Sequence, residues 1–172
     1  MPNTKPVGVA YADPELVAGT TITGATIDAT SLTASNVVLG ASTQVQKATI
    51  ATTGNSDAFI IAPYDGVLSA AIFSGVDALA ASNTNFITFT ITNLGQAGAG
   101  SAAMLAATDV NTTKTTGGTA LSANTRRNLT LSATSANLAV ARGDRLRLRA
   151  AVTGTLVNTV TFPVYVLIWA TA

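Results

Sequence analysis

The side chains with the clearest chemistry are arginines that recur at every second position near the C-terminus. Arg145, Arg147 and Arg149 alternate with Leu146 and Leu148. Successive side chains of a β-strand point to opposite faces, so this spacing predicts a strand with arginines on one face and leucines on the other. Guanidinium groups in such a row repel one another, and each favours an anionic partner such as a carboxylate or a phosphate.

Three environments for this arginine row remain open from the sequence. The row can be solvated, or it can pair with Asp57, Asp65 or Asp77 of the same or a neighbouring subunit. It can also contact an acidic surface on another protein. Nucleic acid is the least favoured partner, because no aromatic side chains are interleaved with the arginines to stack on bases.

The missing residue types exclude much of enzyme chemistry. The chain has no His and no Cys, which excludes a Ser-His-Asp triad, a Cys-His pair, the usual zinc sites and disulfides. The carboxylates are scattered, lack the spacing of an EF-hand, and include a single glutamate, Glu15. A pair of acids brought together by folding and a calcium site built on one Asp stay open. We predict a protein that is not an enzyme, with no catalytic residue, metal or cofactor.

Three short motifs match functional patterns but are explained by local structure. The Arg-Gly-Asp triplet at 142–144 resembles an integrin-binding sequence, yet Gly-Asp before a strand is ordinary turn chemistry. The segment 98–103 fits G-x-G-x-x-A, but no acidic residue follows about 20 positions later and no βαβ unit surrounds it. Arg126 and Arg127 fall in a stretch rich in Ser, Asn and Thr, so we expect both to be exposed.

The aromatic side chains near the C-terminus have two interpretations. Phe162, Tyr165 and Trp169 can form a platform that stacks on carbohydrate, or they can pack in a core or a subunit interface. The second interpretation is favoured because aliphatic residues occupy the alternate positions of 164–170. This run is the longest strongly apolar one and is far shorter than the about 20 residues of a membrane-spanning helix. We therefore expect no membrane partner.

The elements that position these residues are predicted to be strands. Thr, Val, Ile and Asn dominate, period-2 alternation is frequent, and Gly, Asn, Asp and Pro separate the runs. The pattern predicts an all-β fold, an antiparallel β-sandwich of the jelly-roll type, over residues 44–172. The expected strands are 45–52, 57–62, 66–74, 85–93, a weaker one at 101–107, 128–133, 144–152 and 157–169.

Residues 1–43 have a different pattern and are predicted to form an extended N-terminal arm. Within 20–39 the sequence has a five-residue period in which Ile22, Ile27, Leu32 and Val37 occupy the same slot. This period resembles pentapeptide repeats, although four units make only one coil, which cannot bury its ends alone. The segment is either a simple strand-and-turn arm or a set of units that stack against other chains. Both need a partner surface, so we predict that these four residues pack or anchor the arm.

Charge and hydropathy leave two ways for the chain to stay in solution. Only 10% of residues are charged, the formal net charge is +1 and the mean hydropathy is +0.42. Residues 44–172 carry eight basic and five acidic side chains, an imbalance too small to indicate nucleic-acid binding. A weakly charged chain that is this apolar can bury surface in an oligomer, or it can cover its β surface with Thr, Asn and Ser.

The stretch Thr21-Ile22-Thr23-Gly24-Ala25-Thr26-Ile27-Asp28-Ala29-Thr30 resembles segments near the N-termini of tailed-bacteriophage head-fibre, decoration and tail-fibre proteins. The family has Gly-Gly where this chain has Gly24-Ala25. Residues 138–146, with Gly143-Asp144 before a long strand, look like a turn of jelly-roll virion domains and lectin-like domains.

The resemblance implies a homotrimeric virion structural protein on the outside of a phage capsid, made in the host cytoplasm. Its partners would be further copies of itself and the major capsid protein, with Arg145, Arg147 and Arg149 in polar contacts between subunits or with the capsid. No nucleic acid is expected as a partner. The alternative is a head- or tail-fibre domain that binds a receptor or a glycan.

Overall fold

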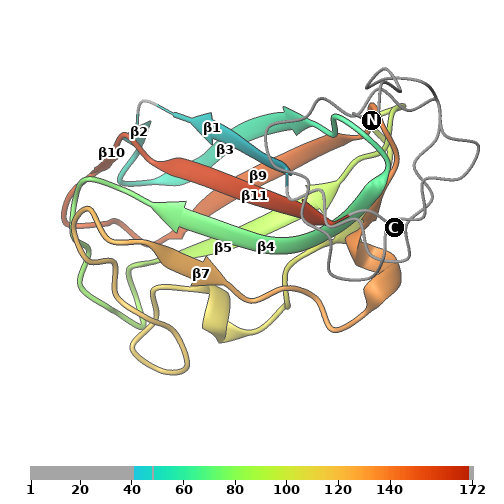
Figure 1. The fold of residues 1–172 in the computed structure, drawn as a ribbon. Helices are drawn as coiled ribbons and strands as arrows, with labels where there is room; N and C mark the ends of the chain where they lie inside the picture. The colour runs from blue at the N-terminus through green and yellow to red at the C-terminus, as the bar shows by residue number, and fades with distance from the viewer. Residues whose placement is uncertain (1–40, 48, 171–172) are drawn as a thin grey trace, which may run out of the picture. The chain divides into compact units, whose positions relative to one another are not determined.

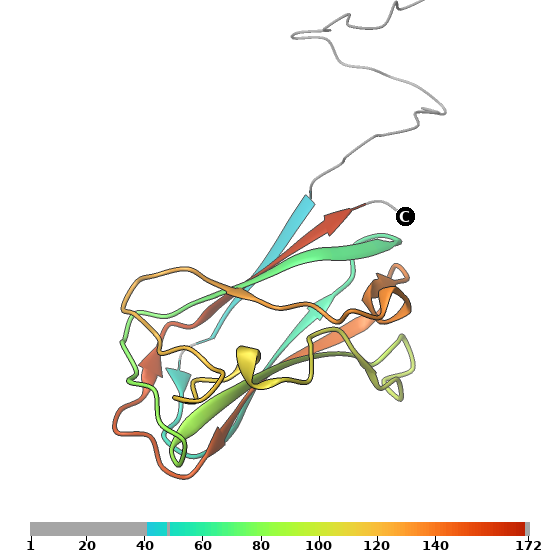
Figure 2. The same cartoon turned by 90° about the horizontal axis from the view of Figure 1, so that it is seen from below.

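The alternating residues build two antiparallel sheets that pack face to face (Figure 1). The structure, a computed structural model, describes residues 41–47 and 49–170. The front sheet has the strand order β1-β11-β4-β7, with β8 beside β4, and the back sheet has the order β3-β9-β5-β6. A short pair, β2 with β10, forms a third sheet. Figure 2 shows the two main sheets as separate layers.

The strand bounds are as follows: β1 Ala41–Gln46, β2 Thr49–Ile50, β3 Gly54–Ile61, β4 Gly66–Ser74, β5 Phe86–Asn93, β6 Ala102–Ala103, β7 Arg127–Leu129, β8 Ala139–Val140, β9 Arg145–Thr153, β10 Val160–Thr161 and β11 Val164–Ala170. Two short 3₁₀ helices, η1 Asp109–Asn111 and η2 Ser135–Leu138, lie in the loops. No helix among the described residues is long and apolar enough to cross a membrane.

The strand order is that of a jelly roll. If the eight strands along the two main sheet paths are numbered consecutively, the sheets read 1-8-3-6 and 2-7-4-5. Apart from β5 and β6, neighbours in each sheet are not consecutive in the chain, and every pairing is antiparallel. The predicted all-β antiparallel sandwich is confirmed. The jelly-roll order follows because every connection along this path, except that between β5 and β6, crosses from one sheet to the other.

The core lies between the two sheets and is made by the inward face of each strand. Leu146 and Leu148 of β9 are fully buried, as is Ile87 of β5. The ring of Phe73 from the front sheet bridges the layers, with its centroid 4.6 Å from that of Phe89 in the back sheet. Each large apolar side chain buried in this way contributes about 1.5–3 kcal/mol relative to its exposed state.

The strands with clean alternation were located well, and those interrupted by special residues were not. The expected strands 66–74 and 85–93 match β4 and β5 to within a residue, and 57–62 and 144–152 largely coincide with β3 and β9. The expected strand 157–169 is wrong in its middle, where it divides into β10 and β11. Pro163 has no N–H for a ladder bond, and Phe162 has a left-handed backbone with φ 45°.

Three other expected strands are also shorter or divided. The segment 45–52 separates into the end of β1 and the two-residue β2, while 101–107 and 128–133 reduce to β6 and to the end of β7. The expected boundary between residues 43 and 44 falls inside β1, which pairs with β11 from Ala41 onward. The described residues belong to the second of two compact units, Asn36–Ala172.

Candidate interaction surfaces

The three arginines lie together on the outward face of the back sheet, as the spacing predicted. In the register between β3 and β9, Arg149 faces Asp57, Arg147 faces Phe59 and Arg145 faces Ile61. On the other side of β9, Thr90 faces Arg149 and Thr92 faces Arg147. We call the face formed by Asp57, Phe59, Ile61, Arg145, Arg147 and Arg149 the arginine face.

Arg149 is neutralised within the chain. Its Nε and Nη2 donate to Oδ1 and Oδ2 of Asp57, both at 2.7 Å, in a two-pronged ion pair. The hydrogen bond from Arg149 is the main reason why the pKa of Asp57 lies below its ordinary value. The same bond raises the pKa of Arg149. This pairing is one of the alternatives left open by the sequence, and it uses an aspartate of the same chain.

Arg145 and Arg147 are not paired with a carboxylate within the described residues. The guanidinium carbon of Arg145 lies 4.1 Å from the centroid of the Phe59 ring, a cation–π contact. The Nε of Arg147 is buried and has no hydrogen-bond acceptor in the part of the chain that is described. Phe59 and Ile61 beside them are 42% and 58% exposed.

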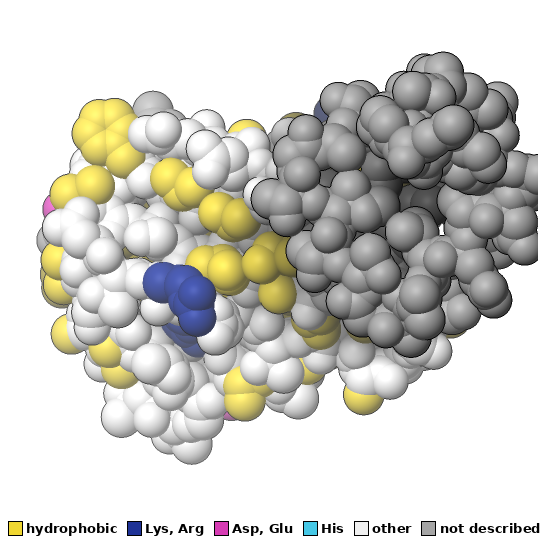
Figure 3. Space-filling view, in the orientation of Figure 1, with side chains coloured by type: hydrophobic (Ala, Val, Ile, Leu, Met, Phe, Trp, Pro, Cys, Tyr) yellow, Lys and Arg dark blue, Asp and Glu magenta, His cyan; other side chains and the backbone are white. Residues whose placement is uncertain are grey.

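The outward face of the front sheet is the second surface, and it is uncharged along its three longest strands. Val166 of β11 faces Gln44 of β1 on one side and Ile72 of β4 on the other. Figure 3 shows apolar side chains gathered along the middle of this face, where Figure 1 draws β11 and β4. We call this the aliphatic face; its outward residues are Val164, Val166, Ile168, Ala70, Ile72 and Ser74, bordered by Ser42, Gln44 and Gln46.

Two of the three C-terminal aromatics are in the core, and the third is not. Tyr165 and Trp169 are buried, and the Nε1 of Trp169 donates to Thr43 Oγ1 at 3.1 Å. Phe162 is 55% exposed and lies between β10 and β11, so the core interpretation is wrong for this residue, and the subunit-interface interpretation stays a prediction.

Two further exposed apolar side chains lie in loops near Phe162 in the sequence or tied to its neighbour Thr161. Val157 is 84% exposed and Val76 is 42% exposed. Their loops are tied together, because the N–H of Val76 donates to the carbonyl of Thr161 and Asp77 Oδ2 accepts from both the N–H and the hydroxyl of Thr161. These two hydrogen bonds lower the pKa of Asp77.

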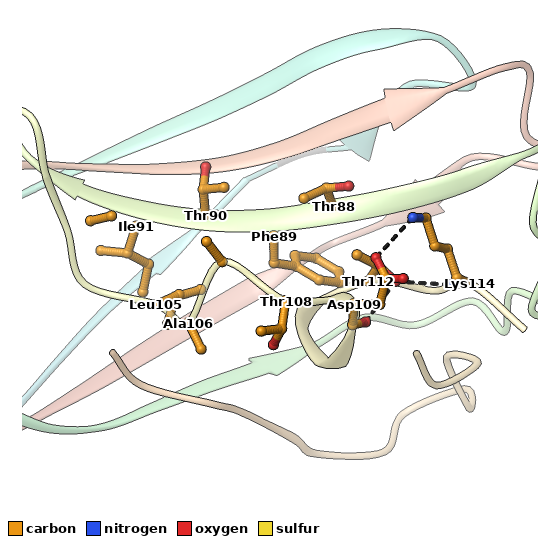
Figure 4. A pocket seen from close by; sticks show the side chains of 12 residues that line it. Thr88, Phe89, Thr90, Ile91, Leu105, Ala106, Thr108, Asp109, Thr112 and Lys114 are labelled. Atoms are coloured by element: carbon orange, nitrogen blue, oxygen red, sulfur yellow. Dashed lines mark hydrogen bonds and ion pairs between the residues drawn. The ribbon is translucent and has the colours of Figure 1, made fainter. Parts of the chain in front are cut away.

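A groove of about 280 Å³ lies along the edge of β5, between the two-residue β6 and the isolated bridge from Thr88 to Thr112. Figure 4 shows Phe89 and Ile91 pointing below the strand, and the loop with Leu105 and Thr108 forming the opposite wall. At its rim, Lys114 Nζ pairs with Asp109 Oδ1 at 2.8 Å. Asp109 is the one carboxylate among the lining residues, so the groove does not supply the pair of acids that glycoside hydrolysis uses.

Two polar residues that sequence reasoning undervalued hold the loops beneath this groove. Asn111 is 1% exposed, and its side-chain amide donates to the carbonyls of Ala106 and Thr130 while accepting from the N–H of Thr130. The prediction that Arg127 is exposed is wrong. Its guanidinium donates to the carbonyls of Val110, Thr112 and Thr119 and lies over Phe89. Arg126 is exposed, as expected.

The Arg-Gly-Asp triplet forms a turn, as predicted. Gly143 has φ 89°, a left-handed backbone that favours glycine. Asp144 is buried, and its Oδ2 accepts from Asn93 Nδ2 at 2.8 Å and from the N–H of Ala141 at 2.9 Å. An aspartate held in this way is not free to bind a partner.

No cluster of three metal-ligating side chains occurs among the described residues. The four residues predicted to anchor the arm, Ile22, Ile27, Leu32 and Val37, lie outside the described part of the chain.

Comparison with family models, curated proteins and solved structures finds no match to this chain. The proposals below therefore rest on the surfaces themselves and on the resemblance of the N-terminal stretch.

Proposed function

We propose that this chain is a non-enzymatic structural protein of a bacteriophage virion that decorates and stabilises the capsid as a homotrimer. The observation that carries the proposal is the aliphatic face, a sheet surface of Val and Ile with no charged side chain on the outward positions of β1, β4 and β11. Such a face favours burial against another protein surface, and interfaces between identical subunits are the more apolar kind.

The mechanism in this proposal is mechanical. Contacts among three copies would bury the aliphatic faces, and the resulting trimer would present three arms and three arginine faces to the capsid. Because the contacts are linked, the second and third are effectively intramolecular and raise the overall avidity without new chemistry. The groove along β5 carries a neutralised Asp109–Lys114 pair and is not needed for this role.

The oligomeric state tests the proposed interface. We expect light scattering on the full chain to give three times the chain mass of 17.2 kDa. Val166→Lys places a charge in the centre of the aliphatic face and should convert the trimer to monomers. Val157→Lys is the matched control, because Val157 is 84% exposed on a loop and should leave the trimer intact. A monomeric wild-type chain, or a trimer indifferent to Val166→Lys, would contradict the proposal.

The virion role is tested separately. An antibody against the chain, detected with gold in electron micrographs, should label the heads of virions produced by the genome that encodes it. Labelling of tails, or of no virion structure, would contradict a capsid-decorating role even if the protein is a trimer.

A second candidate function, recognition of a receptor or a glycan, is favoured by Phe162. An exposed aromatic ring at a loop-rich end is the feature that carbohydrate stacking uses, and Asn158, Thr159 and Thr161 precede it in the sequence. Binding to a glycan array that is lost in Phe162→Ala, while the oligomeric state is unchanged, would favour this candidate over capsid decoration.

A further inference from the structure

The arginine face combines features that a solvated sheet surface does not need. It carries three guanidinium groups and one carboxylate, and the carboxylate is already used by Arg149. Two apolar side chains, Phe59 and Ile61, are exposed directly beside the two remaining arginines. Exposed charge on a strand is ordinary, but a row of arginines beside exposed Phe and Ile on the neighbouring strand has the composition of an interface core.

Arg147 is the best placed anchor in this face. Its Nε is buried without an acceptor among the described residues, so the guanidinium has lost water without gaining a partner on that side. Phe59 and Thr92 face it on the two neighbouring strands. Arg147 as a whole is half-buried, and a carboxylate that reaches the accessible part of its guanidinium would gain charge-assisted hydrogen bonds in a partly dehydrated site.

The arginine face is better suited to bind a protein surface than a chain of phosphate groups. The ring of Phe59 is covered by the Arg145 guanidinium at 4.1 Å, so its plane is not free to stack on a base as single-strand binding requires. Asp57 places a fixed negative charge at the end of the row, which opposes a continuous line of phosphates. A protein surface can match this pattern with one or two carboxylates beside apolar groups.

We propose that the arginine face docks a carboxylate-bearing surface of another protein, with Arg147 as the anchoring residue and Phe59 and Ile61 as its apolar contacts. Arg145 supplies the second charge, and the Asp57–Arg149 pair marks the end of the contact. Within the function proposed above, on which the identity of the partner rests, that protein is the capsid. The binding chemistry itself is measured independently of the oligomeric state and of virion labelling.

The probe is a fluorescent decapeptide of alternating Glu and Thr, measured by anisotropy against the full chain at low ionic strength. Its Gln-Thr counterpart removes the carboxylates, and an oligothymidylate of equal charge replaces them with phosphates. We expect the Glu peptide to bind, the Gln peptide to bind at least about tenfold more weakly, and added salt to weaken the complex.

The variants locate the contact on the arginine face. Arg147→Gln should weaken binding of the Glu peptide at least about fivefold, whereas the matched control Arg126→Gln, on an exposed loop residue, should change it less than about twofold. Asp57→Asn frees Arg149 and should strengthen binding about two- to fivefold. A misfolded variant does not gain affinity, so this increase distinguishes docking from a structural role of the arginines.

Three results would overturn the proposal: no binding of the Glu peptide by the wild-type chain, equal losses in Arg147→Gln and Arg126→Gln, or tighter binding of the oligothymidylate than of the peptide. The last result would replace the protein partner by a nucleic acid. Failure of the peptide assay with a trimer and labelled heads intact would remove this docking site and leave the proposed function standing.

Discussion

At the scale of single residues, identical side chains in one row have different surroundings. Arg149 is closed into an ion pair with Asp57, Arg145 covers the Phe59 ring, and Arg147 keeps an unmatched Nε. The repulsion expected for three neighbouring guanidinium groups is therefore relieved at one end only. The charge that remains for a partner is concentrated at Arg147 and Arg145.

The Asp57–Arg149 pair should make folding stability depend on acidity. The pKa of Asp57 lies below 3.8 in the folded chain, so the unfolded chain takes up its proton first as the pH falls. The stability from this pair is complete above that ordinary value and is lost as the pH passes through the lowered folded pKa. Because the pair is partly exposed, we expect a loss of about 0.5–1 kcal/mol.

Chemical denaturation at a series of pH values measures this effect. The free energy of unfolding of Asp57→Asn should fall less steeply below pH 3.8 than that of the wild-type chain. Arg149→Gln should flatten the same limb, and the double variant should add little further. Equal acid slopes in all four proteins would show that the pair does not contribute.

The backbone of Phe162 should be strained, and a substitution by glycine should relieve that strain. A side chain with a Cβ at φ 45° costs about 1–2 kcal/mol in the left-handed region, whereas glycine avoids that cost and gives back about 0.5–1 kcal/mol in unfolded-state entropy. We therefore expect Phe162→Gly to be more stable than Phe162→Ala by about 0.5–1 kcal/mol in urea denaturation. The reverse order would mean that the backbone at this position is not strained.

At the scale of elements, polar side chains provide hydrogen bonds to the backbone where the strands are too short to do so. β6 and β7 have two and three residues, and the segment from 104 to 131 crosses the edge of the sandwich largely without ladder bonds. The Asn111 side chain donates to two backbone carbonyls and accepts from one backbone N–H of this segment, and the Arg127 guanidinium donates to the carbonyl of Thr112. These two side chains therefore connect loop segments of the fold.

Asn111 and Asn128 provide a matched comparison, because each begins an Asn-X-Thr triplet and only the first is buried. Asn111→Ala leaves the Ala106 carbonyl and the Thr130 N–H without their side-chain partner, while the Thr130 carbonyl still accepts from the N–H of Ala106, and it should cost about 2–4 kcal/mol. Asn128→Ala, on the outer face of β7, should stay within about 0.5 kcal/mol of wild type. Similar unfolding free energies for the two variants would contradict the structural role of Asn111.

At the scale of the whole molecule, the two outward sheet faces differ in chemistry. The aliphatic face on the front sheet carries Val and Ile bordered by Gln and Ser, and the arginine face on the back sheet carries the charge. A sandwich with one apolar and one cationic face can use the first for its own copies and the second for a different partner. This division of roles joins the two proposals.

Subunit burial should appear as a concentration-dependent melting temperature. Mass action stabilises a folded oligomer as the protein concentration rises, so the Tm of the wild-type chain should increase with concentration in calorimetry. In Val166→Lys the Tm should be independent of concentration, and in Val157→Lys it should behave like the wild type. A wild-type Tm that does not change with concentration would contradict an oligomer that unfolds to separate chains.

Local patterns in the amino-acid sequence are sufficient to predict the fold class and the inward and outward faces of the longest alternating strands. Period-2 alternation is a local property, and the same pleat that sends Leu146 and Leu148 inward sends Arg145, Arg147 and Arg149 outward. The Gly143-Asp144 turn is equally local, because glycine tolerates the positive φ and aspartate bonds to its own turn. These features were therefore predicted without knowledge of the sheet order.

Contacts between residues that are distant in the sequence depend on the tertiary structure. Arg149 and Asp57 are 92 positions apart, and their pairing depends on the register of β3 against β9, which no local pattern specifies. Arg127 is half-buried because loop carbonyls from 110, 112 and 119 converge on it, and Phe162 is exposed in the link between β10 and β11. Contacts of this kind arise from the packing of distant segments, so composition and spacing do not contain them.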